Sequence, residues 1–167
     1  MAASEKGYTF IESMVVLSLI GLLAVLAVEN LGDGLSHYRL RHAGQQLAAD
    51  IRQIRQKAIT EGIPNRIQFV PDARLYRLPG MGERALPSRV RFGLKTGIPH
   101  LPNTGSVPSD GISFKENDVV FQPNGTIMGI GGTIYFTTDL ERHEAVAVTA
   151  NVTGRVKIYK WSGAEWR

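Results

Sequence analysis

The chain has 167 residues, of which 43% are hydrophobic and 20% charged, and its formal net charge is +4. This composition excludes an intrinsically disordered protein, and the length leaves room for one small globular domain beside a membrane segment. The absence of cysteine excludes a fold held together by disulfides.

Residues 8–28 form an almost uninterrupted apolar run with one formal charge, Glu12. A helix of this length spans about 30 Å, the thickness of the hydrocarbon core of a bilayer, so the run predicts a membrane helix. An ionised carboxylate inside it costs about 2.5–3.5 kcal/mol, and Glu12 is therefore expected to be protonated or to have a cationic partner. If the chain is cut after Gly7, the new amino group on Tyr8 lies about one helical turn from Glu12. In an assembly, that amine could neutralise the Glu12 carboxylate of a neighbouring subunit.

Residues 31–62 predict an amphipathic helix that packs on a sheet. Gly32 and Gly34 are expected to weaken or break the helix near its start. Gly62 and Pro64 are expected to end it. Its apolar face is set by spacings of three and four and comprises Leu40, Leu47, Ile51, Ile54, Ala58 and Ile59.

Residues 63–167 predict a β-rich head, with short alternating segments every ten or so residues and turn signals between them. Residues 79–83 are expected to form a turn, and residues 96–110, which are rich in Pro and Gly, an irregular loop. The fold class predicted is α+β, a long N-terminal helix packed on antiparallel sheet. The expected strands are 66–70, 73–78, 89–93, 112–114, 119–122, 133–137, 145–149 and 155–160.

The N-terminal residues Gly7-Tyr-Thr-Phe-Ile-Glu12, followed by the apolar run, resemble the prepilin processing site of type IV pilins and type II secretion pseudopilins. The resemblance implies that a prepilin peptidase cuts between Gly7 and Tyr8 and methylates the new N-terminus, and that Glu12 is the assembly residue. Tyr8 departs from the usual Phe or Met. The leader, residues 1–7, carries both Glu5 and Lys6, which gives a weak positive-inside signal.

The head resembles the GspH/FimT group of minor pilins and pseudopilins through the order of several short motifs. These are residues 58–64, 121–125, 133–136, 145–148 and 153–157. The resemblance implies a structural subunit of a type II secretion pseudopilus or a type IV pilus, and the sequence does not choose between the two. It also implies a single pass through the bacterial inner membrane, a periplasmic head, and other pilin subunits as partners. The division expected is leader 1–7, membrane and assembly helix 8–30, amphipathic helix 31–62 and head 63–167.

The C-terminal strand carries a second hypothesis. Alternation places Arg155, Lys157 and Tyr159 on one face, with Lys160 on the other face beside two apolar residues. Cations bind phosphates and aromatic rings stack on bases, so Arg155, Lys157, Tyr159 and Lys160 are candidate DNA-binding residues. Some DNA-uptake minor pilins of the group carry a Gly-Arg-x-Arg element near the C-terminus that residues 154–157 resemble, although Lys157 lacks the bidentate guanidinium. The alternative is an edge strand whose exposed cations prevent aggregation.

The sequence predicts no catalytic residues, no cofactor and no metal site, and hence no enzyme. The four histidines lack the spacing of metal ligands, and no nucleophile motif is present.

Overall fold

The computed structural model describes residues 9–102, 108–138 and 145–167, and for residues 25–34 it describes the backbone only. The chain divides into two compact units, Met1–Leu35 and Ser36–Arg167. The first unit contributes the N-terminal part of the helix α1 (Phe10–Glu61), and the second contributes the rest of α1 and every described strand. Gly7 and Tyr8, between which cleavage is expected, lie outside the described residues.

Helix α1 continues through Gly32 and Gly34, so the expected break is absent. Glycine lowers helix propensity but adopts helical dihedral angles readily, so two glycines leave the backbone hydrogen bonds in place. The end of the helix is as predicted. Gly62 follows Glu61 with a φ of 66°, the left-handed conformation that glycine adopts at helix C-termini, and Pro64 follows two residues later.

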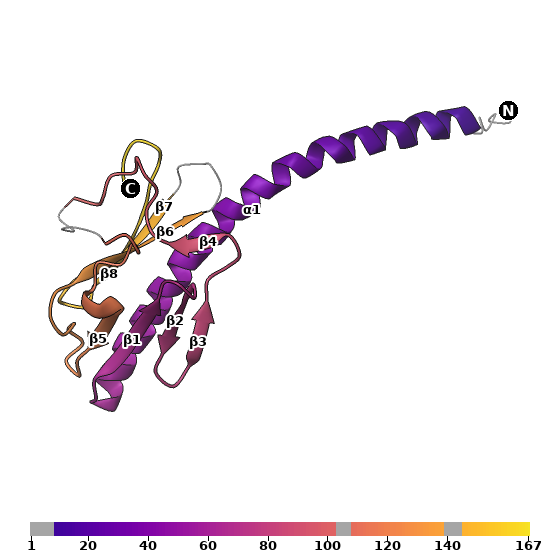
Figure 1. Cartoon of the computed structure of the whole chain (residues 1–167). Helices are drawn as coiled ribbons and strands as arrows, with labels where there is room; N and C mark the ends of the chain where they lie inside the picture. Colours follow the sequence, from indigo (N-terminus) through magenta and orange to yellow (C-terminus); the bar gives the residue numbers. More distant parts are fainter. Residues whose placement is uncertain (1–8, 103–107, 139–144) are drawn as a thin grey trace, which may run out of the picture. The chain divides into compact units, whose positions relative to one another are not determined.

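The described strands form two four-stranded antiparallel sheets (Figure 1). Sheet A has the order β3-β2-β1-β5, and sheet B the order β4-β6-β7-β8. The strands are β1 (Asn65–Val70), β2 (Leu75–Leu78), β3 (Gly82–Ala85), β4 (Val90–Phe92), β5 (Asp118–Phe121), β6 (Gly132–Thr138), β7 (Ala145–Ala150) and β8 (Val156–Lys160). A short 3-10 turn, η1 (Lys115–Asn117), precedes β5. The predicted α+β architecture is confirmed.

Two predicted elements differ from the structure. Strand β3 begins at Gly82, within the segment 79–83 that was expected to be a turn, because its backbone pairs with β2 from Leu75↔Ala85 to Leu78↔Gly82. The expected strand 112–114 is reduced to one isolated bridge, Ile112↔Ile134.

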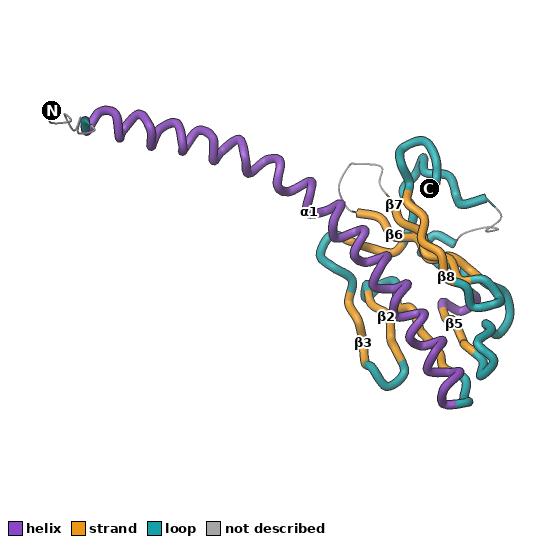
Figure 2. Tube along the Cα trace, turned by 180° about the vertical axis from the view of Figure 1, so that it is seen from behind, coloured by secondary structure: helices purple, strands orange, loops and turns teal. Residues whose placement is uncertain are grey.

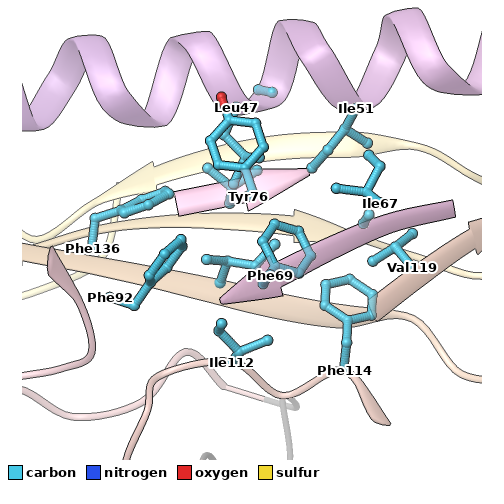
Figure 3. Packing of buried hydrophobic residues seen from close by; sticks show 14 of the residues in the cluster. Leu47, Ile51, Ile67, Phe69, Tyr76, Phe92, Ile112, Phe114, Val119 and Phe136 are labelled. Atoms are coloured by element: carbon cyan, nitrogen blue, oxygen red, sulfur yellow. The ribbon is translucent and has the colours of Figure 1, made fainter. Parts of the chain in front are cut away.

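The core lies between α1 and both sheets, with helix and strand side chains meeting in one cluster (Figure 3). Viewed from behind, the part of α1 that belongs to the second unit runs across the strands (Figure 2). Phe69 of sheet A meets Phe92 of sheet B with ring centroids 6.2 Å apart, so the two sheets share this core. The predicted helix face is buried at Leu40, Leu47, Ile51, Ile54 and Ala58, each at most 1% exposed. Ile59 is a wrong prediction, since it is 39% exposed one position beyond the end of that face.

Helix α1 approaches sheet B closely at Gly44. A Cβ atom placed on Gly44 would lie 2.5 Å from Cγ1 of Val146 on β7. A side chain at position 44 would therefore push the helix away from the sheet.

Candidate functional site

The first turn of α1 is capped by Thr9. The Thr9 hydroxyl oxygen accepts a hydrogen bond from the Glu12 amide at 3.3 Å, and the Thr9 carbonyl accepts from the Glu12 and Ser13 amides at 3.1 and 3.2 Å. Thr at the N-cap and Glu three residues later is the sequence order of a capping box. Glu12 also lies in the first turn, where the helix dipole favours a negative charge. This local role of Thr9 was missed in the sequence analysis, although the Thr-x-x-Glu spacing signals it.

The side chains described in the N-terminal part of α1 are largely apolar and exposed. Phe10 is 83% exposed, Ile11 72%, Leu17 67% and Leu23 64%. Within the part of the chain that the structure describes, no helical stretch meets the length and hydropathy needed to cross a membrane.

Strand β8 alternates as the sequence predicts. Val156 and Ile158 pack against the main core, whereas Tyr159 packs on the opposite face of sheet B against a small cluster of Leu101, Tyr135 and Ala147. Lys160 pairs in register with Val146, a residue of the main core, so it shares the face of Val156 and Ile158.

The four candidate DNA-binding residues therefore do not form one surface. Arg155 and Lys157 are exposed, and among the described residues neither side chain forms an ion pair. Tyr159 is half-buried, packs against the small cluster and lines a pocket with Trp161 and Trp166, so its ring does not lie on an open face with the two cations. Lys160 lies on the other side of the strand.

The edge of β8 is partly covered. One Arg52 side-chain nitrogen donates to the Val156 carbonyl at 3.5 Å, and the backbones of Lys160 and Arg167 exchange two hydrogen bonds of 2.7 and 2.9 Å. Covered backbone groups and exposed cations are both devices that keep an edge strand from pairing with other chains. Both interpretations of Arg155 and Lys157, DNA binding and edge protection, are compatible with this geometry.

Arg55 explains two of the glycine motifs in the head. Its Nε donates to the Gly125 carbonyl at 2.9 Å. Gly154 has a φ of 75°, and a Cβ there would lie 2.3 Å from the Gly125 carbonyl and 2.5 Å from Arg55 Nε. The turns at residues 122–126 and 151–154 thus meet over one helix side chain and leave no room for a methyl group. Gly125 and Gly154 therefore have a structural role, because they allow the two turns to pack closely just before β8.

A buried carboxylate joins α1 to sheet A. Asp50 is 2% exposed and accepts hydrogen bonds from Tyr76 (2.5 Å) and Gln46 (3.1 Å), and it pairs with Arg84 Nε at 3.1 Å. The Tyr76 pKa is raised, mainly by burial and then by the hydrogen bond to Asp50 and its negative charge. This network was not predicted from the sequence. Its signal was an aspartate three residues after Leu47, on the apolar face of the helix.

No family model matches the chain. The chain is 38% identical over 89 residues to the type II secretion system protein H of Xanthomonas campestris pv. campestris. The matched segment covers 52% of this chain and 53% of that protein. The chain thus spans about half the length of this curated relative.

Two solved structures share the fold. The minor pseudopilin EpsH from the type 2 secretion system of Vibrio cholerae matches with a TM-score of 0.53 and 12% identity, over 76% of this chain and 99% of that one. The type IV minor pilin FimU of Pseudomonas aeruginosa matches with a TM-score of 0.53 and 12% identity, over 78% of this chain and 94% of that one. At such low identity these matches establish the fold, which is the pilin-like α+β fold.

The fold, the order of the head motifs and the sequence match point the same way: the chain has the pilin-like fold and is similar in sequence to type II secretion system protein H.

Proposed function

We propose that this protein is a minor structural subunit of a type II secretion pseudopilus or a type IV pilus, and not an enzyme. The observation that carries the proposal is a capped, apolar N-terminal helix segment, with an acid in its first turn, joined to a pilin-like head. Its relative is named for the type II secretion system, and the two structural neighbours are a minor pseudopilin and a minor pilin.

The apolar segment from Tyr8 to Val28 is proposed to lie in the bacterial inner membrane as a single pass before assembly, with the head in the periplasm. Side chains as exposed as Phe10 and Leu17 need lipid or sister helices around them, because their exposure to water is unfavourable. The Ser18 hydroxyl donates to the Met14 carbonyl at 2.8 Å, so it has a partner within the helix. In the filament, the same surface would contact the helices of other pilin subunits.

The charge of Glu12 decides how the subunits join. A carboxylate in the first turn gains about 0.3–1 kcal/mol from the helix dipole. Its insertion into the apolar layer costs about 2.5–3.5 kcal/mol. The dipole is therefore too weak by itself, so the carboxyl group is either protonated or paired with a cation, and we propose the cation. Prepilin peptidase is proposed to cut between Gly7 and Tyr8, which creates an amino group that can reach Glu12 of the neighbouring subunit.

The experiment compares Glu12→Gln with Thr9→Ala in a host that expresses the other subunits. Glu12→Gln removes the charge and keeps the shape, whereas Thr9→Ala removes the helix cap and keeps the charge. Both variants should insert in the membrane. Only Glu12→Gln should lose cross-linking to neighbouring subunits, and retained cross-linking in Glu12→Gln would contradict a role for the Glu12 charge in assembly.

The second candidate function is DNA binding during uptake, favoured by two exposed cations, Lys157 on β8 and Arg155 in the residue before it. Two such contacts would make binding weak, independent of sequence and strongly dependent on salt. The test is the binding of a DNA duplex to the full chain in detergent at two salt concentrations. Loss of binding in Arg155→Ala/Lys157→Ala, with binding retained in Arg74→Ala, would support this function. Equal binding by all three proteins would contradict it.

A further inference from the structure

A pocket of about 560 Å³ lies on the face of sheet B that is turned away from α1. It is formed by the loop at residues 99–102 and by the C-terminal segment that folds back after β8. Its lining is rich in rings and comprises Pro99, His100, Leu101, Pro102, Tyr159, Trp161, Ala164, Glu165 and Trp166. The volume falls within the range of about 300–1,000 Å³ that is typical of small-ligand sites.

The aromatic wall is held in place by fixed contacts. Trp166 Nε1 donates to the Pro99 carbonyl at 2.8 Å, and its ring packs on Tyr135 with centroids 5.7 Å apart. The Tyr135 hydroxyl accepts from the Leu101 amide at 3.0 Å, which ties the loop to the sheet. Trp161 stands 5.7 Å from Trp166, at an interplanar angle of 59°. A ligand would therefore meet rings that are already oriented, which lowers the entropic cost of binding.

The turn that closes this segment is also well ordered by hydrogen bonds. The Ser162 amide and hydroxyl both donate to the Glu165 carbonyl, at 3.0 and 2.9 Å, and the Glu165 amide donates to the Ser162 hydroxyl oxygen at 3.2 Å. This turn positions the Glu165 side chain at the pocket. There the Glu165 carboxylate pairs with Nε and Nη2 of Arg167, each at 2.7 Å.

We infer that this pocket binds a neutral sugar, as a segment of an oligosaccharide. The faces of indole and phenol rings pack against the C–H faces of a sugar ring. The Glu165–Arg167 pair offers acceptors and donors for hydroxyl groups, and both side chains are more than half exposed. The carboxylate and the guanidinium balance each other, so the pair adds no net charge, and a phosphate group gains little there.

The charge distribution along β8 distinguishes this site from the DNA hypothesis. Lys157 lies two residues from Tyr159, about 6.6 Å along the strand at roughly 3.3 Å per residue, and Arg155 lies further away. The pocket lining contains neither cation. A nucleic acid would need Arg155 and Lys157, whereas a neutral sugar would not. The inference goes beyond the proposed assembly role and does not depend on it.

The test uses intrinsic fluorescence, because both tryptophans of the chain line this pocket. The full chain, purified in a detergent without a sugar headgroup, is titrated with chitotetraose, cellotetraose and maltotetraose, and in parallel with oligo(dT). We expect a saturable change in emission with at least one neutral oligosaccharide. Binding should weaken at least tenfold in Trp161→Ala and at least threefold in Glu165→Gln, and it should be unchanged in Arg155→Ala/Lys157→Ala.

Glu165→Gln changes one exposed side chain, so it keeps the test valid if Trp161→Ala does not fold. The inference is overturned if none of the three oligosaccharides gives a saturable signal at millimolar concentration. It is equally overturned if oligo(dT) alone produces the change, or if the Arg155→Ala/Lys157→Ala variant loses sugar binding as strongly as Glu165→Gln.

Discussion

Replacing Tyr76 by Phe tests the buried network that fixes α1 on sheet A. The change removes one hydroxyl and keeps the ring, which packs 6.2 Å from Phe69. Figure 3 shows the Tyr76 ring between α1 and the core side chains. The Tyr76 hydroxyl donates a hydrogen bond to the Asp50 carboxylate. Asp50 keeps its contacts with Gln46 and Arg84, so the variant loses one charge-assisted hydrogen bond and creates no unpaired charge.

A hydrogen bond to a charged group contributes about 1.5–3 kcal/mol. Removing every partner of a buried charge would cost about 3–5 kcal/mol, which is the upper bound here. We therefore expect Tyr76→Phe to lower the free energy of unfolding by about 1.5–3 kcal/mol and Tm by roughly 5–12 °C. The assay is urea denaturation of the full chain in detergent, followed by tryptophan fluorescence.

Arg84→Met is the matched control. Arg84 also contacts Asp50, but its side chain is 42% exposed, so solvent screens the pair and the expected loss is at most about 1 kcal/mol. The reasoning is refuted if Tyr76→Phe costs less than about 0.5 kcal/mol, or if Arg84→Met costs more than Tyr76→Phe.

Three further predictions follow from the same packing. Because the folded-state pKa of Tyr76 lies above its ordinary value of 10.0, the stability from its neutral form is full below pH 10 and is lost as pH rises further. Urea titrations at pH 8 to 11 should show that the free energy of unfolding falls more steeply with pH in the wild type than in Tyr76→Phe. The same pH dependence in both proteins would contradict this. Gly154→Ala should destabilise by at least about 2 kcal/mol, from the left-handed φ and the clash with the Gly125 carbonyl. Gly163→Ala is the control, because Gly163 has a φ of 96° but no atom lies within 4 Å of an added Cβ. It should lower the free energy of unfolding only by the cost of the left-handed backbone, about 1–2 kcal/mol. Equal destabilisation of the two variants in thermal melts would exclude a contribution from the clash at Gly154. Gly44→Ala should lower the free energy of unfolding by about 1–3 kcal/mol, because the added methyl group forces Val146 aside. An unchanged Tm would show that α1 can move away from sheet B without cost.

The helix and most strands were predictable because their signals are local. The spacing of Leu47, Ile51 and Ile54 gave the buried face of α1, and Gly62 with Pro64 gave its end. Strand β3 was not predictable in this way. Its sequence, Gly-Glu-Arg-Ala, lacks β-branched and aromatic residues, and its backbone is a strand because β2 lies beside it.

The candidate site was predictable only in part. Alternation correctly separated Lys157 and Tyr159 from Ile158, because the period of two is a property of the strand itself. It could not show that Trp166 returns to pack on Tyr135 of β6, since that contact depends on a turn after β8. The buried role of Asp50 likewise required Tyr76 and Arg84, which lie on strands far away in the sequence.

The most direct test of the proposed subunit is the intact mass of the protein isolated from the membrane of a host that contains prepilin peptidase. The account predicts a chain that begins at Tyr8, with residues 1–7 removed and one methyl group added. A chain that keeps residues 1–7 would lack the amino group proposed to pair with Glu12, and that result would contradict the account.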